Sequence, residues 1–341
     1  KDVAKFLRIA NRLGLLVIFR PGPYICAEWD WGGLPAWLLR YVLEGDLRIR
    51  TGDKRYLVFV DRFWGELLPR VQPELLENGG ALAMVQLENE FGHYGDARRP
   101  ADREYFEHLR SLVRKHLGPH VLLITTDDSN AVWESKGGPP DVFSAVNLGP
   151  WDPRPHEHLD SNFAAAQVHN GGGPEFVMEL WSGWFQLWQH DADTEKNFRR
   201  PGTQIVAYVR ELLDRNASFT LYMAHGGTNF GFWAAGGWMM PDLALLSEPR
   251  IWGSTVATSY DYAAPIAEDG SHGFGIDGLD KFAALRDLMA ERRGLGEPPL
   301  PPEPEAPKLA TYRGSGPVGA VVMSPRAALR DPAALGNQTN V

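Results

Sequence analysis

The sequence predicts an α/β fold in which helices cover a parallel β-sheet. The first observation is composition: of the 341 residues, 44% are hydrophobic and 23% are charged, which is typical of a globular protein. The second is that six short apolar runs alternate with longer amphipathic runs along the chain. Strands and helices that alternate in this way form parallel sheets with right-handed crossovers.

The apolar runs define the strands, and the amphipathic runs define the helices between them. We expect strands over residues 14–19, 81–87, 121–126, 141–147, 175–180 and 218–224. We expect helices over residues 1–14, about 53–76, 101–117, 160–169, 201–214 and 276–293.

Two kinds of parallel sheet fit this alternation, a doubly wound open sheet and a closed barrel. No G-x-G-x-x-G run follows a strand, which disfavours a doubly wound sheet that binds a dinucleotide. Polar or aromatic residues stand at or just after nearly every strand end: Tyr24, Glu28, Asn89, Glu90, Asp127, Asp128, Asn147, Glu179, Tyr222 and His225. Because a barrel gathers its C-terminal strand ends into one site, we predict a TIM (β/α)8 barrel. About six of its eight β/α units are visible, so we expect two further strands before Lys1.

Composition also divides the chain into parts. The barrel is expected to occupy residues 1–294. A Pro/Glu-rich linker, "LGEPPLPPEPEAP", follows at residues 295–307 and is stiffened by its prolines. Residues 308–341 contain a strand-like "GAVVMS" but are too few to hold a core, so we expect them to begin a truncated β-rich domain.

The charge of the chain limits the classes of molecule that it is expected to bind. A formal net charge of -9, with no Lys/Arg-rich run, argues against nucleic acid and against an anionic membrane surface. No apolar run approaches the ~18 residues that a membrane span needs. Cys26 is the only cysteine, so no disulfide can form within the chain. We expect a neutral or cationic ligand, and we expect no cofactor and no metal.

The stretch "MVQLENEFGHYG" at residues 84–95 places two glutamates at the end of a strand. The period of two in a strand predicts that Glu88 and Glu90 face the barrel interior, with Glu88 deeper and Glu90 at the rim. A buried carboxylate is costly unless it is paired or hydrogen-bonded. This stretch alone fits an internal hydrogen-bond network as well as it fits a catalytic acid.

A second strand-end carboxylate favours catalysis. In "EFVMELWSGWFQLW", residues 175–188, Glu179 ends an apolar run and is followed by Trp181, Trp184 and Trp188. Taken alone, Glu179 fits a salt bridge. Two glutamates at one barrel mouth, surrounded by aromatic rings, are what glycoside hydrolysis requires: one protonates the leaving oxygen, and the other attacks or activates water.

Five motifs closely resemble glycoside hydrolase family 35, the β-galactosidase family. They follow the family's order and are "VIFRPGPYICAEWDWGGLPAWLL" (17–39), "QLENEFGHYG" (86–95), "ELWSGWF" (179–185), "LYMAHGGTNFGFW" (221–233) and "TSYDYAAPIAEDG" (258–270). The resemblance implies a retaining exo-glycosidase that hydrolyses terminal non-reducing β-D-galactosyl residues of oligosaccharides or glycoconjugates.

The resemblance also implies roles for individual residues. Glu90 matches the general acid/base, and Glu179 matches the nucleophile of a double displacement. Asn89 matches the residue that holds the 2-hydroxyl of the sugar. The other substrate-binding residues that we expect are Tyr24, Cys26, Ala27, Glu28, Tyr222, Tyr262 and Trp184. A retaining mechanism predicts that the two catalytic carboxyl groups lie ~5–5.5 Å apart.

Other polar residues receive structural interpretations. We expect Tyr260 and Asp261 to brace a loop, and Cys26 to pack beside the site rather than to act as a nucleophile. We expect Asp127 and Asp128 to cap a helix or to support site residues rather than to line the site. We assign the pair His156 and His158 to a solvated loop rather than to a metal site. Two alternatives to a β-galactosidase stay open: an exo-β-glucosaminidase or another exo-glycosidase of this fold, and a non-catalytic fragment that binds galactosides.

Overall fold

The core of the computed structural model is a parallel sheet of six strands in chain order. The structure describes residues 2–134, 136–139, 141–187, 199–235, 256–294 and 298–305. The strands are β1 (Val17–Phe19), β2 (Leu82–Gln86), β3 (Leu122–Asp127), β4 (Phe143–Leu148), β5 (Phe176–Trp181) and β6 (Ser218–Tyr222). Every neighbouring pair runs parallel, so all six predicted strands and their arrangement are confirmed.

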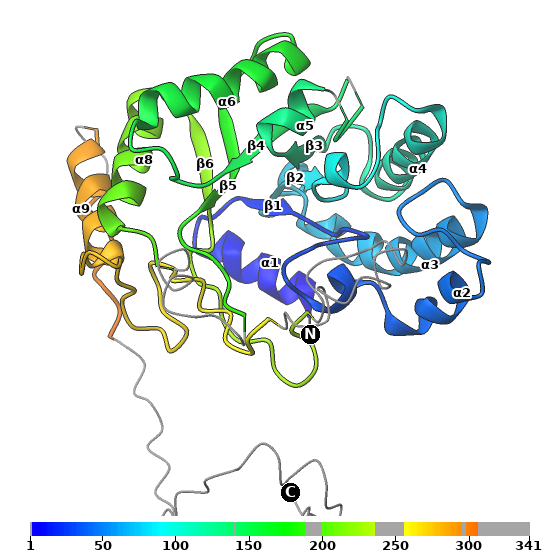
Figure 1. The fold of residues 1–341 in the computed structure, drawn as a ribbon, viewed down its shortest axis with the longest axis horizontal. Helices are drawn as coiled ribbons and strands as arrows, with labels where there is room; N and C mark the ends of the chain where they lie inside the picture. Colours follow the sequence, from blue (N-terminus) through cyan, green and yellow to red (C-terminus); the bar gives the residue numbers. More distant parts are fainter. Residues whose placement is uncertain are drawn as a thin grey trace, which may run out of the picture. The chain divides into compact units, whose positions relative to one another are not determined.

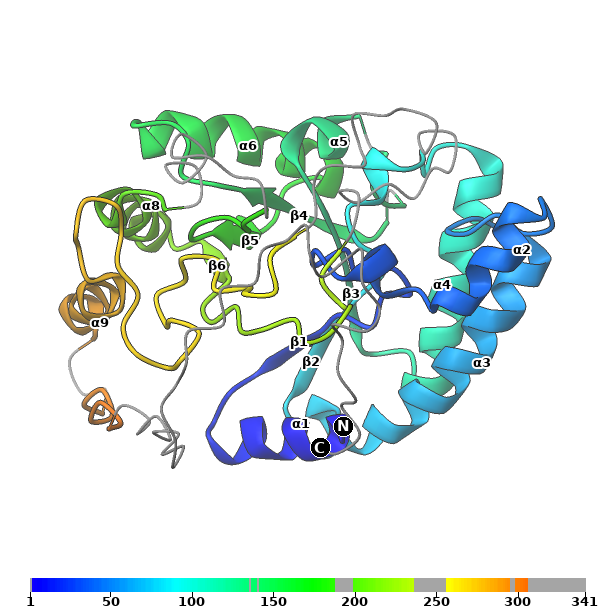
Figure 2. The same ribbon diagram turned by 60° about the horizontal axis from the view of Figure 1, so that its bottom comes forward.

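Helices form an arc outside the strands (Figures 1 and 2). The described α-helices are α1 (Val3–Arg12), α2 (Leu39–Leu43), α3 (Lys54–Val71), α4 (Pro100–Leu117), α5 (Ser129–Trp133), α6 (Pro155–Asn170), α8 (Gly202–Asp214) and α9 (Lys281–Arg292). Short 3-10 helices are η1 (Asp30–Gly33), η2 (Ala36–Leu38), η3 (Gln72–Glu74), η4 (Leu76–Asn78) and η5 (Phe91–His93).

Helix boundaries differ from the predicted ones where local chemistry starts or stops a helix. Helix α6 begins at Pro155 and not at residue 160, because proline suits the first helical position. The segment that holds His156 and His158 is therefore helical, and its assignment to a loop was wrong. Helix α9 begins five residues later than predicted, since Gly278 has a φ of 76° and Asp280 caps the helix by accepting from the N–H of Ala283.

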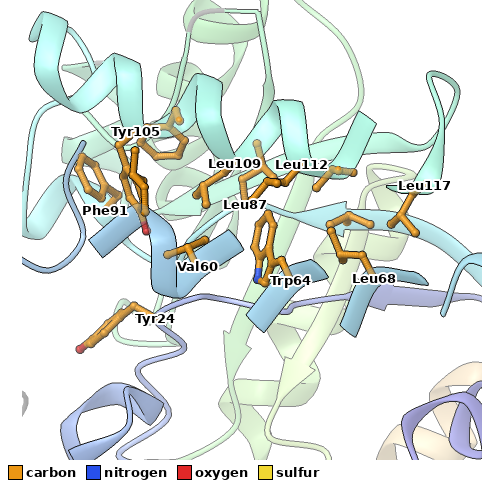
Figure 3. Packing of buried hydrophobic residues seen from close by; sticks show 14 of the residues in the cluster. Tyr24, Val60, Trp64, Leu68, Leu87, Phe91, Tyr105, Leu109, Leu112 and Leu117 are labelled. Carbon is orange, nitrogen blue, oxygen red and sulfur yellow. The ribbon is translucent and has the colours of Figure 1, made fainter. Parts of the chain in front are cut away.

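Packing between α3, α4 and the end of β2 forms one apolar core. Figure 3 shows Trp64 and Leu68 of α3 facing Leu109 and Leu112 of α4, near Leu87. Trp64 and Leu68 are 0% exposed, and burial of each such side chain contributes about 1.5–3 kcal/mol. A second core lies between β4 to β6 and helices α6, α8 and α9. In both cores the helices pack against the outer faces of the strands, so the strand ends are available to form the site.

The chain is a partial (β/α) barrel. Among the described residues, β1 and β6 are the two edges of the sheet, and the two strands expected before Lys1 stay a prediction. Contacts divide the chain into residues 1–306 and 307–341. The second unit and residues 295–297 lie outside the described residues, so the linker and the β-rich domain also stay predictions. None of the described helices has the length and apolar character that a membrane crossing requires.

Candidate active site

A pocket of about 310 Å³ is lined by all ten residues predicted for catalysis and substrate binding. They are Tyr24, Cys26, Ala27, Glu28, Asn89, Glu90, Glu179, Trp184, Tyr222 and Tyr262. The rest of the lining is Ile25, Arg50, His93, Tyr94 and Trp181. Every one of these residues lies at or beyond the C-terminal end of a strand, which is the end where barrels carry their sites.

Glu179 is a buried carboxylate with a donor on each oxygen. It lies on β5, in register with Asn147 of β4, and is 6% exposed. One oxygen, Oε1, accepts from Nη2 of Arg20, and the other, Oε2, accepts from the indole Nε1 of Trp181 at 3.0 Å. These two N–H donors come from different segments of the chain, and together they fix the orientation of the carboxylate.

Arg20 joins two of the strand ends. It is the first residue after β1, and its Nη2 also donates to Oδ1 of Asn89 at 2.6 Å. Gln86 donates to the same amide oxygen at 3.1 Å. The side-chain oxygen of Asn89, a residue that lines the pocket, is therefore held by two donors.

Glu90 differs from Glu179 in its environment. It accepts one hydrogen bond, from the side-chain nitrogen of Asn147 at 2.9 Å, and Asn147 is in turn held by Thr126 at 2.5 Å. Burial and the nearby charge of Glu179 raise the pKa of Glu90 to about 7. The ionised form of Glu90 is disfavoured because a second carboxylate lies close by. Glu90 therefore holds a proton close to neutral pH.

A cation stands at the rim beside Glu90. Nε2 of His93 contacts the carboxylate of Asp128, and this hydrogen bond raises the pKa of His93 to about 9. Asp128 also caps α5 by accepting from the N–H groups of Asn130 and Ala131, so the capping role expected for it is confirmed. The charge of His93 lowers the pKa of Glu90 and opposes the effect of Glu179.

The loop after β1 turns sharply to bring Glu28 into the pocket. Three consecutive residues have left-handed backbone, with φ of 57° at Cys26, 60° at Ala27 and 46° at Glu28. Such a conformation costs of order 1–3 kcal/mol per non-glycine residue and is characteristic of functional sites. Glu28 is 6% exposed, and burial raises its pKa to about 8.

Tyrosines form the wall opposite this loop. The hydroxyl of Tyr260 donates to Oε2 of Glu28 and lies 2.9 Å from the hydroxyl of Tyr222. The ring of Tyr222 meets that of Tyr262 edge-on at 5.3 Å. Tyr260 does not line the pocket but supports two residues that do, which agrees with the bracing role expected for it. Asp261 braces the same loop, since it accepts from the N–H of Glu268 at 2.8 Å.

Cys26 and Tyr24 pack together on the same side of the pocket. Burial raises the pKa of the Cys26 thiol, so its thiolate is disfavoured at neutral pH. The thiol is hydrogen-bonded to Tyr24. A side-chain carbon on Gly32 would lie 1.9 Å from the Tyr24 ring, so only glycine permits this ring position. Cys26 thus agrees with the expected packing role.

Glu88 faces a different part of the molecule from the one predicted. It accepts from Arg50 at 2.7 and 3.2 Å and from the hydroxyl of Tyr105 on α4 at 2.8 Å. The prediction that Glu88 faces the barrel interior was therefore wrong. Strand β2 ends at Gln86, and a φ of 62° at Glu88 breaks the alternation on which the prediction depended. The carboxylate is instead part of a buried ion pair on the α4 side of the strand end.

Comparison with known proteins gives the family. A model of the glycosyl hydrolases family 35 matches residues 1–291. The chain belongs to this family. The five motifs that resemble family 35 therefore lie within a match that covers most of the chain.

Curated relatives of this family 35 chain carry the name β-galactosidase. The protein of Felis catus is 38% identical over 314 residues, which cover 91% of this chain and 40% of the relative. That of Homo sapiens is 37% identical over 309 residues, with 91% and 40% covered. β-Galactosidase 17 of Arabidopsis thaliana is 38% identical over 309 residues, with 88% and 39% covered. The chain spans about 40% of the length of these relatives.

Solved structures that resemble the family 35 chain are more distant. A GH5_18 protein from Streptomyces cattleya in complex with GlcNAc has a TM-score of 0.48 at 14% identity, and covers 85% of this chain and 66% of its own. The exo-β-1,4-mannosidase Op5Man5 from an Opitutaceae bacterium, strain TAV5, has a TM-score of 0.44 at 12% identity, with 84% and 49% covered.

Several residues that line the family 35 pocket or hold its lining residues were not singled out from the sequence. Arg20 directly follows a predicted strand, so the same strand-end reasoning that found Glu90 and Glu179 would have found it. Arg50 and His93 gave no such signal. Arg50 lies in a loop and meets Glu88 only because the fold brings together residues 38 positions apart.

Rings of tryptophan continue the pocket wall beyond Glu179. Trp181 and Trp184 meet edge-on at 5.2 Å, and Trp151 contacts both of them at 5.9 and 5.8 Å. Trp188, predicted among these aromatic residues, lies outside the described part of the chain.

The other candidate residues take part in structural contacts. Asp127 accepts from the N–H of Gly92 at 2.9 Å. Nδ1 of His156 lies 2.6 Å from Glu211, and Nδ1 of His158 lies 2.6 Å from the hydroxyl of Tyr208. Within the described ranges, no three His, Cys, Asp or Glu side chains gather in a way that could hold a metal ion.

Proposed function

We propose that this family 35 chain carries the active site of a retaining exo-β-galactosidase. The observation that carries the proposal is the contrast between two glutamates in one pocket. Glu179 is held by Arg20 and Trp181, whereas burial and the charge of Glu179 raise the pKa of Glu90 to about 7. Two carboxyl groups in environments this different suit the roles of nucleophile and acid. The names of the curated relatives support a β-galactoside as substrate.

In the first step Glu179 attacks the anomeric carbon of the terminal galactose. The bond to the leaving oxygen breaks while Glu90 gives that oxygen its proton, and an ester forms between Glu179 and the sugar. The ester carries no charge, so one of the two causes that raise the pKa of Glu90, the charge of Glu179, is lost, while its burial remains. Glu90 is then ionised, as the second step requires.

In the second step Glu90 takes a proton from water, and the water oxygen attacks the anomeric carbon. The ester bond breaks, the carboxylate of Glu179 is restored, and galactose leaves with its original anomeric configuration. We expect Arg20 to favour the ionised form of Glu179 before the attack and to stabilise the carboxylate that the second step restores, because its guanidinium donates to Oε1 of Glu179.

The sugar-binding part of the proposal uses the remaining lining. We assign the amide nitrogen of Asn89 to donate to the 2-hydroxyl and Glu28 to bind the far hydroxyls of the ring, and both residues line the pocket. Tyr24, Cys26 and Ala27 extend this polar side, and Tyr222, Tyr262 and Trp184 supply ring faces against which a sugar packs. A pocket of about 310 Å³ suits one sugar residue, which favours exo-action on a chain end.

The test is turnover of chromogenic β-glycosides by the gene's full product. We expect hydrolysis of the β-galactoside, with far slower hydrolysis of the β-glucoside, which differs at C4, and of the β-glucosaminide, which differs at C2 and C4. Glu179→Gln and Glu90→Gln should each lose activity, and Glu291→Gln, at an exposed glutamate paired with Arg210, should retain it. Near-full activity in either pocket variant would refute the assignment. Galactose binding without turnover by the natural sequence would show a binding protein instead.

A further inference from the structure

Lys281 is a lysine that the fold buries completely. It is the first residue of α9, and its side chain is 0% exposed. Its ammonium donates to the backbone oxygen of Ala263 and, at 3.4 Å, to that of Ser182. Among the described residues, no carboxylate pairs with it within ion-pair distance. Because an ammonium without a counter-charge is expensive to bury, these two carbonyl contacts call for a physical explanation.

The carbonyl of Ser182 belongs to the segment that follows β5, the strand that carries Glu179. Ser182 lies three residues beyond Glu179. Its N–H donates to the backbone oxygen of Tyr222 at 3.1 Å, and its hydroxyl donates to that of Met223 at 2.6 Å. Ser182 thus links the end of β5 to the end of β6, and Lys281 donates to the backbone oxygen of Ser182.

The carbonyl of Ala263 belongs to the loop that carries a pocket tyrosine, Tyr262. Tyr262 and Ala263 both have left-handed backbone, with φ of 61° and 46°. Two such residues in succession persist only where surrounding contacts over-determine them. The bond from Lys281 to the oxygen of Ala263 is such a contact, and the Tyr262 ring that it supports lies 2% exposed against Tyr222 and Trp184.

We propose that Lys281 is a positioning residue of the pocket, whose ammonium holds the Ser182 and Ala263 carbonyls together and so fixes Tyr262 beside the nucleophile segment. A cation suits this place because one charged group satisfies two carbonyl oxygens from separate loops. Lys281 touches neither substrate nor reacting atoms. The effect on turnover rests on the proposed function, whereas the effect on the loop does not.

The charges around Lys281 support a role that depends on its ionisation. Burial lowers its pKa to about 8, against the opposing influence of Asp261 and Asp277, while Arg199 lowers it further. Above that pH the group becomes an amine, which still donates hydrogen bonds but loses the charge assistance. Loss of order in the loop on the alkaline side is therefore expected to accompany the loss of the ammonium.

The experiment compares Lys281→Met with a matched loss of a cation elsewhere. Arg215 at the end of α8 also bridges two segments, through Glu175 at 2.9 Å and Asp160 at 2.7 Å, but at the opposite end of the strands from the pocket. Hydrogen exchange measured by mass spectrometry reports on the loops directly. Lys281→Met should raise exchange in residues 182–187 and 256–266, whereas Arg215→Met should leave both segments protected.

Turnover supplies the second readout. Lys281→Met should lower kcat/KM on a β-galactoside by about 10²-fold, the effect of a small misplacement in a site, while Lys281→Arg restores part of it and Arg215→Met retains the natural value. If Lys281→Met does not fold, Lys281→Gln replaces it, since glutamine keeps a neutral donor. Unchanged loop exchange, or a drop in Tm with natural kcat/KM, would overturn the proposal. If the natural protein turns over no galactoside, the proposed function fails and hydrogen exchange alone decides the role of Lys281.

Discussion

Glu88 and Glu90 lie two residues apart after the same strand, yet their surroundings have little in common. Glu88 is 1% exposed and meets the guanidinium of Arg50 and the hydroxyl of Tyr105. Glu90 meets one amide, from Asn147, and the charge of Glu179 disfavours its ionised form. Both are carboxylates at the end of a buried strand. Glu88 has a counter-charge bonded to its carboxylate, whereas Glu90 is buried beside a like charge, and this difference separates a structural group from an acid.

This contrast explains how both glutamates persist in one short stretch. The ion pair of Glu88 and Arg50 is part of the scaffold, because Arg50 also donates to the backbone oxygen of Asn89 at 2.8 Å and stacks on Tyr24 at 3.8 Å. The scaffold thus orients the pocket residues that flank Glu90. Among the described residues, the carboxyl of Glu90 forms no ion pair, and burial together with the charge of Glu179 outweighs the opposing charges of His93 and Arg20, so its pKa stays raised, as a proton donor requires.

Removal of the acid should have the largest effect. Glu90→Gln should lower kcat/KM by about 10²- to 10⁴-fold on a galactoside with a poor leaving group, because that leaving oxygen needs a proton. Formation of the galactosyl-enzyme from a dinitrophenyl galactoside should change little, since dinitrophenolate leaves without protonation. Steady-state and burst kinetics on both substrates measure the difference. An equal loss in the bond-breaking step for the two substrates would contradict the role of acid.

Neutralisation of Glu88 should lower the stability of the fold more than it lowers turnover. Glu88→Gln should lower the free energy of unfolding by about 3–5 kcal/mol, because it leaves the buried Arg50 without its partner. Urea unfolding measures this, with the exposed Glu66→Gln as the control. Per folded molecule, the loss of kcat/KM should be much smaller than in Glu90→Gln. If Glu88→Gln were as stable as the Glu66→Gln control, the ion pair would not contribute to the stability of the fold.

Replacement of both members of the ion pair sharpens this test. Glu88→Leu with Arg50→Met should be more stable than either single substitution, since no unpaired charge stays buried. A double-mutant cycle on the free energy of unfolding measures the coupling. If the two single losses simply add, the two side chains do not act as a pair.

The pH dependence of turnover tests the other side of the comparison. Because the acid form of Glu90 is the active one and its pKa is raised to about 7, kcat/KM should fall as pH rises through about 7. The imidazolium of His93 lowers the pKa of Glu90, so His93→Gln should move this descending limb to higher pH. His108→Gln, at a histidine of α4 that contacts Asp61, is the control and should leave the limb in place. Movement of the limb to lower pH in His93→Gln would contradict this account.

Much of this arrangement was predictable from local sequence. Apolar runs predicted every strand of the described sheet, and the residues at their ends predicted Glu90 and Glu179, because parallel strands carry their sites at one edge. The period of two failed at Glu88, where left-handed backbone turns the side chain toward α4. Such a turn depends on tertiary contacts with Arg50 and Tyr105, which no local pattern encodes.

The partners of residues that act across long separations were also beyond local patterns. Lys281 meets Ser182 from 99 positions away, and Arg20 meets Glu179 from 159 positions away. The strand end places Arg20 near the site, but the sequence around Arg20 or Lys281 does not show which group either residue contacts. Only the closure of the strand ends around one pocket brings their charges to the carbonyl and carboxylate groups that they hold.

The most direct test of the account is to trap the ester that Glu179 is proposed to form. A 2-deoxy-2-fluoro-β-galactoside with a dinitrophenyl leaving group forms the glycosyl-enzyme but releases it slowly, because fluorine at C2 destabilises the positively charged transition states while the good leaving group rescues only the first step. Peptide mapping by mass spectrometry of the labelled gene product then locates the sugar. We predict the label on Glu179 and unchanged peptides around Glu28, Glu88 and Glu90. A label on any of those three, or no label on a protein that hydrolyses β-galactosides, would contradict the account.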